Sequence, residues 1–158
     1  MSVAITFAVA VITTSCGYSE KEEEAIASSA DSAIFDVGVT KDYERMLAVI
    51  DSFDRAEIIS PLDANRWRGT AYYRMGKYLP SEVYFKKAVD DTPQTSQDRL
   101  SYVKAARRLS ELLLVKGDYE GALQVAMPAV EKMKAMGTGS DIDFAILLNN
   151  IGCCQINL

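Results

Sequence analysis

Residues 69–93, which read GTAYYRMGKYLPSEVYFKKAVDDTP, decide the fold of this chain. Proline suits the first turn of a helix, because the backbone donor that it lacks would have no partner there. A helix that begins at Pro80 carries one stripe of small and apolar residues at helical spacing: Ser81, Tyr84, Phe85, Ala88 and Val89. The preceding Met75-Gly76-Lys77 is predicted as a turn, since glycine adopts left-handed backbone angles at low cost. The stretch therefore predicts two short helices folded against each other.

Small side chains are available where these two helices would touch. They are Gly69 and Ala71 on the first helix, and Ser81 and Ala88 on the second. Such residues allow a close approach, and Tyr72 and Phe85 are then expected to fill the space between the helices. Burying one aromatic ring of this kind is worth roughly 1.5–3 kcal/mol.

The pattern resembles the tetratricopeptide (TPR) repeat, whose consensus runs W-x2-L-G-x2-Y, then A-x3-F and a closing P. The residues on the motif are Gly69, Tyr72, Phe85, Ala88 and Pro93, with Ser81 where a small alanine is usual. Asn65 and Arg68 depart from it, because they occupy the tryptophan and leucine positions, and Trp67 lies two positions away. The resemblance implies an all-α fold, an α–α superhelix of TPR-like helical hairpins.

Weaker copies of the hairpin lie on both sides of it. Upstream, helices are expected at residues 25–37 and 42–57 as an atypical leading unit. Downstream, Thr95 and Ser96 are expected to cap a helix that runs to about residue 116, and the helix after it should bend at Pro128. A last helix is expected over residues 141–158.

These elements make about three hairpins and an unpaired final helix within residues 25–158. The repeats are expected at about 27–61, 62–102 and 103–144, with a partial repeat at 145–158. Corresponding positions Gly69, Ser110 and Gly152 are about 41 residues apart, whereas the plain repeat has roughly 34. The surplus should lengthen the helices and the loops between units. Because the apolar residues of the final helix have no hairpin partner, we expect this sequence to be a fragment of a longer protein.

Residues 1–16 are predicted to be an export segment. Residues 3–12 are apolar apart from Thr6, which is too short a run to span a bilayer but suits a secretory signal. Cys16 follows small polar residues in an arrangement that resembles the lipobox of bacterial lipoproteins, which implies lipidation of Cys16. Thr13 replaces the usual leucine and no Lys or Arg precedes the apolar run, so an apolar helix with an incidental cysteine is the alternative. Residues 17–24 are predicted to be an acidic tether.

Composition limits the functions that this chain can have. Its 158 residues are 49% hydrophobic, which is enough for one domain with a core. A net charge of -5 argues against a nucleic-acid surface, which needs concentrated positive charge. The absence of histidine excludes imidazole metal ligands and nucleophiles activated by histidine. We therefore expect no catalytic residues, no metal and no cofactor.

A binding surface remains, because the first helices of successive TPR repeats line a concave groove that takes peptides or partner helices. The resemblance places these residues in the groove: Arg66, Thr70, Tyr73, Arg74, Lys104, Arg107, Glu111 and Asn149. Five of the eight carry basic or amide groups, which would suit an acidic segment or a carboxylate terminus. The alternative is that the basic residues are merely solvated helix faces. If they form the site, reversing the charges of Arg66 and Arg107 should weaken binding without unfolding the chain.

The array also resembles the extracytoplasmic sensing region of bacterial sensor histidine kinases. The phrases that carry this resemblance are AARRLSELLLVKGDY, residues 105–119, and LLNNIGCCQ, residues 147–155. It implies a non-catalytic module that binds a protein or peptide, in the periplasm and associated with the membrane through a lipid or a downstream anchor. The alternative is a membrane-anchored TPR lipoprotein that scaffolds an envelope complex. An enzyme is a distant third hypothesis.

Overall fold

The computed structural model describes residues 20–137 and 142–158, and this part of the chain is helical with no strand. The helices are α1 Glu20–Val39, α2 Tyr43–Arg55, α3 Pro61–Arg74, α4 Tyr78–Asp90, α5 Ser96–Val115, α6 Tyr119–Ala135 and α7 Ile142–Asn157. The predicted all-α class is therefore confirmed. Cys16 and the predicted export segment lie outside the described residues.

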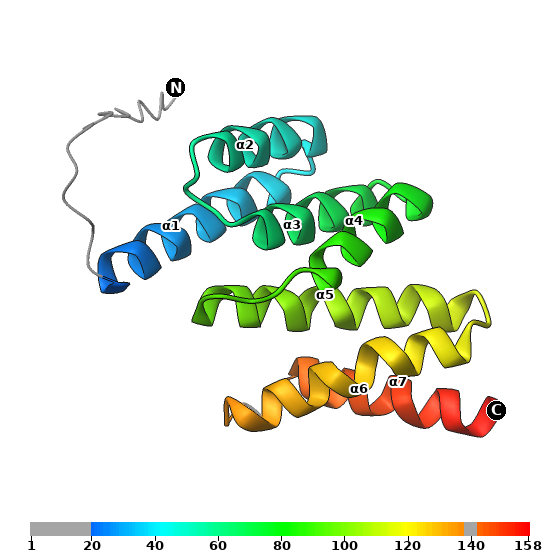
Figure 1. Cartoon of the computed structure of the whole chain (residues 1–158). Coiled ribbons are helices and arrows are strands. Elements are labelled where there is room, and N and C mark those ends of the chain that lie inside the picture. The colour runs from blue at the N-terminus through cyan, green and yellow to red at the C-terminus, as the bar shows by residue number, and fades with distance from the viewer. Residues whose placement is uncertain (1–19, 138–141) are drawn as a thin grey trace.

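Each even-numbered helix packs between two odd-numbered ones, so α2 contacts α1 and α3, α4 contacts α3 and α5, and α6 contacts α5 and α7. The odd-numbered helices α3, α5 and α7 also contact one another in sequence order. Figure 1 shows α5, α6 and α7 running back and forth beside the pair formed by α3 and α4. Within the described ranges the chain thus forms three helical hairpins followed by a single helix.

Helices α3 and α4 pack closely at Gly69, as predicted from the small residues of the two helices. A Cβ atom on Gly69 would lie 2.6 Å from Cδ1 of Phe85, so only glycine leaves room for that ring. Phe85 is fully buried. The buried hydroxyl of Ser81 donates a hydrogen bond of 2.9 Å to the carbonyl oxygen of Gly69. Tyr72 is only half-buried and stacks on Tyr84, with 5.5 Å between the ring centroids.

Each of the three hairpins closes through a short turn. Its middle residue has a positive φ in each case: 63° at Lys41, 73° at Gly76 and 79° at Gly117. In the two glycine turns the following N–H bonds back to the preceding helix at 2.9 Å, from Lys77 to Tyr72 and from Asp118 to Leu113. Glycine suits this conformation because it has no Cβ to clash. The repetition expected from sequence is therefore also present in the backbone.

Several boundaries differ from expectation. Helix α1 begins at Glu20, so part of the predicted acidic tether is helical, and α4 begins two residues before Pro80. Thr95 caps α5 as expected, in a capping box with Asp98. The repeat boundary expected at residues 102 and 103 falls inside α5, which begins at Ser96, and the boundary expected at 144 and 145 falls inside α7. The surplus length of the repeat lies partly in α5, which has 20 residues, and in α6, which has 17, against 14 in α3 and 13 in α4. Helix α6 continues through Pro128 without a break.

Ion pairs connect the second hairpin to the third. Glu82 on α4 accepts a hydrogen bond of 2.8 Å from Lys116 in the turn after α5, and it also pairs with Lys86. The hydrogen bonds from Lys116 and Lys86 lower the pKa of Glu82 from its usual value. No helix in the described ranges is both long and apolar enough to cross a membrane.

The two glycines at corresponding helix positions provide a matched test of this packing. Gly69→Ala should destabilise the fold by about 1–3 kcal/mol, because the added methyl group must displace the Phe85 ring. Gly152→Ala should stabilise it by about 0.5–1 kcal/mol, since nothing lies within 4 Å of that position and alanine favours helix. Urea denaturation of both variants measures the difference. Equal effects would show that Gly69 is not packed against Phe85.

Candidate functional site

A hollow of about 230 Å³ lies between the first helices of the array. Its lining comes from α1, α3, α5 and the start of α7: Phe35, Arg66, Trp67, Thr70, Tyr73, Arg74, Lys104, Arg107, Arg108 and Asp143. We call it the basic hollow. Six of the eight residues predicted for a groove are among them, all except Glu111 and Asn149.

Helical spacing explains why these side chains share one hollow. On α3, Arg66, Thr70 and Arg74 follow each other at intervals of four residues and therefore lie on one face. On α5, Lys104 and Arg108 have the same spacing. Because α3 and α5 pack side by side, the two faces border the same space.

Polar contacts hold α3 and α5 in this orientation. The hydroxyl of Ser60, the N-cap of α3, donates a hydrogen bond to Asp98 in the first turn of α5. One turn further on, the hydroxyl of Ser101 donates to Asp63 Oδ1 at 2.6 Å, and both residues are buried. Hydrogen bonds are directional, so these two contacts fix the rotation of each helix about its axis as well as the distance between the helices.

Arg66 forms the floor of the hollow and is not a free charge. It is only 3% exposed, it pairs with Asp31 of α1 and Asp63, and its guanidinium lies 3.7 Å from the centre of the Trp67 ring. The Trp67 Nε1–H donates to the same Asp31 carboxylate at 2.7 Å. This burial and pairing argue against the expectation that the charge of Arg66 could be reversed without unfolding the chain. A glutamate there would add a third carboxylate to a buried site that already holds two.

The α5 side of the hollow is a partly buried ion-pair network. Arg107 bonds to Glu111 at 2.9 Å, and its Nε lies 2.5 Å from Asp143 Oδ1 on α7. Arg108 bonds to the other oxygen of Glu111 at 2.8 Å and lies over the Tyr73 ring, 4.9 Å from its centre. Glu111 therefore orients the two arginines and does not itself line the hollow.

Two cations that line the hollow, Arg74 and Lys104, have no ion-pair partner among the described residues, and we call them the uncommitted cations. The guanidinium of Arg74 lies near the Phe35 ring, 6.0 Å from its centre. Phe35 is 48% exposed, so an apolar surface borders these charges. The hydroxyl of Thr70 donates to the backbone carbonyl of Arg66 at 2.9 Å and keeps its lone pairs available as acceptors.

Two of the predicted groove residues, Glu111 and Asn149, do not line the hollow, and several residues that line it were not predicted. Asn149 is exposed on α7 and does not line the hollow, whereas the next residue, Asn150, is buried and donates to Ser110 at 2.9 Å. Phe35 and Asp143 were missed because they come from α1 and α7, which reach the hollow only through tertiary packing. Arg108 was within reach, since it lies four residues after Lys104 on the same helix.

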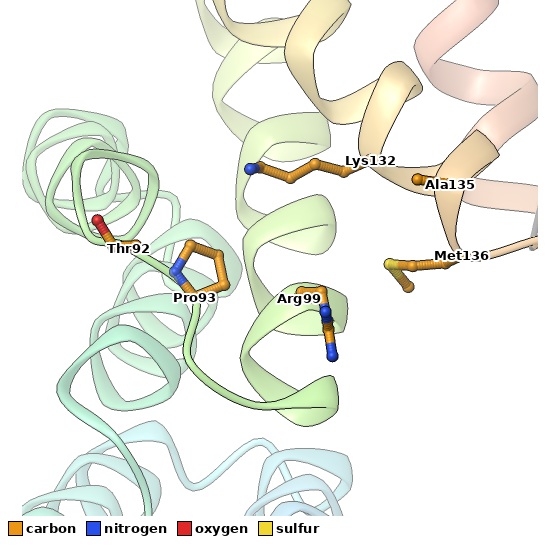
Figure 2. Close-up of a pocket in the computed structure, with 6 residues that line it drawn as sticks. All are labelled: Thr92, Pro93, Arg99, Lys132, Ala135 and Met136. Atoms are coloured by element: carbon orange, nitrogen blue, oxygen red, sulfur yellow. The ribbon is translucent and has the colours of Figure 1, made fainter.

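A second hollow, of about 280 Å³, lies where the loop before α5 faces the end of α6. Figure 2 shows Lys132 and Arg99 reaching it from different helices, with Thr92, Pro93, Ala135 and Met136 around them. The Lys132 ammonium lies 4.8 Å from the centre of the Tyr102 ring and makes a cation–π contact with it. Arg99 and Lys132 also have no ion-pair partner among the described residues. We take the basic hollow as the candidate site because residues of four helices line it and six of them were predicted for the groove.

Comparisons of this chain with protein-family models, with curated proteins and with solved structures find no match. In the described ranges no three Cys, Asp or Glu side chains lie together as a metal-binding group would require. The functional interpretation therefore depends on the hollow itself.

Replacing Arg66 tests its structural role. Arg66→Ala should lower the free energy of unfolding by about 3–5 kcal/mol, because it leaves buried Asp63 without its cation while Asp63 Oδ2 already lacks a partner. Arg74→Ala removes an exposed cation without an ion-pair partner from the same helix and should change it by no more than about 0.5 kcal/mol. Urea denaturation distinguishes the two. An Arg66→Ala variant as stable as Arg74→Ala would contradict the assignment.

Proposed function

We propose that this chain is a non-catalytic, TPR-like module that binds an acidic segment of a protein or peptide in the basic hollow. The observation that supports this most directly is that Arg74 and Lys104, from different helices, border one hollow without carboxylate partners of their own. The whole chain has a net charge of -5, so this local positive surface is opposite to the average of the molecule. A positive patch on an acidic protein favours encounter with a negatively charged partner at that place.

The chemistry of the lining suits carboxylates. An arginine can bind a carboxylate through two parallel N–H groups, and a lysine adds a point charge with three donors. Arg74 and Lys104 would supply these groups, while Phe35 and Tyr73 offer rings against which the apolar part of the ligand can pack. With about 230 Å³, the hollow has room for a few side chains of an extended segment and not for a folded domain. Binding of this kind should weaken as salt is added, because the charges are partly exposed.

The all-helical hairpin array and the repeated turn support the TPR-like part of the proposal. The sensing region of a receptor of the sensor histidine kinase type, outside the cytoplasm, remains our leading hypothesis for the biological role, and a membrane-anchored lipoprotein scaffold remains the alternative. Both roles use a surface that captures another protein. The full-length reading frame distinguishes them: a helix of about 20 apolar residues followed by a kinase supports the receptor, whereas a polar capping helix and a stop codon support the scaffold.

Charge reversal at the two uncommitted cations tests the proposed site. The probe is a fluorescein-labelled hexaglutamate peptide, and its binding is followed by fluorescence anisotropy at low salt. The double variant Arg74→Glu with Lys104→Glu should bind at least about tenfold more weakly, because attraction at the hollow becomes repulsion.

The matched control is Arg99→Glu with Lys132→Glu, which makes the same change in net charge at the second hollow. It should leave affinity within about twofold of the unmodified protein, and circular dichroism should show that both variants are folded. Equal loss of affinity in the two double variants would show that the peptide responds to overall charge, and would contradict a site at the basic hollow.

A further inference from the structure

The basic hollow already contains a carboxylate from its own chain. Asp143, in the first turn of α7, is the one lining residue that α7 contributes among the described residues, and it is 23% exposed at its side chain. Its Oδ1 lies 2.5 Å from Arg107 Nε. Arg107 also bonds to Glu111 at 2.9 Å, so its guanidinium is shared between two acidic groups from different helices.

The contact between Asp143 and Arg107 is close but poorly aligned. The Nε atom of Arg107 is buried and forms no hydrogen bond with any described residue, although the Asp143 oxygen is within ion-pair distance. A buried donor without an aligned acceptor costs free energy that a better placed acceptor can recover. Asp143 therefore covers this donor without satisfying it.

The corresponding arginine of the preceding repeat shows what a permanent contact looks like. Arg66 pairs with Asp31 on α1 and with Asp63 on its own helix, and its side chain is 4% exposed. Its Nε donates an aligned hydrogen bond to Asp63 at 3.1 Å. Arg107 is more exposed than Arg66, at 13% of its side-chain area, whereas Asp143 and Asp31 are equally exposed at 23%. Arg107 and Asp143 both line the hollow. A partly exposed, misaligned pair is easier to exchange than a buried, aligned one.

We propose that Asp143 is an internal competitor for the acidic ligand. Its carboxylate occupies the position on Arg107 that a ligand carboxylate would take, and a bound acidic segment displaces it. This inference depends on the proposed function, since it names the regulation of the same site. A ligand carboxylate at this position gains no additional ion pair, because it replaces Asp143, whereas further carboxylates of an acidic run also gain Lys104 and Arg74. Because Asp143 belongs to α7, displacing it also releases one contact between α7 and α5.

The experiment compares Asp143→Asn with Asp36→Asn by anisotropy of the labelled hexaglutamate peptide. Asp36 is an exposed residue next to Phe35 on α1, so its replacement removes the same charge near the hollow without freeing Arg107. Asp143→Asn should tighten binding about two- to fivefold, which is the range expected for losing a partly exposed ion pair of up to about 1 kcal/mol. Asp36→Asn should tighten peptide binding by a factor less than half as large as the factor for Asp143→Asn. Denaturation should show Asp143→Asn slightly less stable than the unmodified protein.

The possible results separate the inference from the function on which it depends. Unchanged or weaker binding by Asp143→Asn would mean that Asp143 only braces α7, and would overturn the inference while the binding site stands. Equal tightening by both variants would also overturn it, because the effect would then be that of net charge. Absence of binding by the unmodified protein and by both variants would overturn the proposed function together with the inference.

Discussion

The contact between Gly69 and the ring of Phe85 is the constraint on which the rest of the structure depends. Without a Cβ at position 69, α4 can approach α3 until the ring fills the interface and Ser81 reaches the Gly69 carbonyl. Helix α3 is then held by α4 on one side and by α5 on another. This packing leaves the face of α3 that carries Thr70 and Arg74 turned toward the hollow.

Polar groups at the interface, and not apolar area alone, fix the relative orientation of α3 and α5. An apolar interface tolerates small rotations of a helix, whereas the bonds from Ser60 to Asp98 and from Ser101 to Asp63 do not. Arg66 extends the same network to Asp31 on α1.

Most of the architecture was predictable because it depends on local pattern. The stripe around Phe85, the Gly76 turn and the Thr95 cap are short-range signals, and they placed the helices to within a few residues. The site was predictable where it depends on helical spacing along α3 and α5. The site was not predictable where it depends on tertiary packing. The burial of Arg66 requires an aspartate on α1. Which of Asn149 and Asn150 is buried depends on the rotation of α7, because successive residues of a helix point about 100° apart.

Stacked hairpins bring basic groups of α3 and α5 to one surface, and the central question is whether an acidic peptide binds there. Nuclear magnetic resonance of the ¹⁵N-labelled protein, titrated with the hexaglutamate peptide, tests this directly. If the peptide binds in the basic hollow, backbone amide signals should shift around Thr70, Arg74, Lys104 and Arg108, and those around Lys132 should not. Shifts that cluster at the second hollow, or that spread evenly over all exposed lysines and arginines, would contradict binding in the basic hollow.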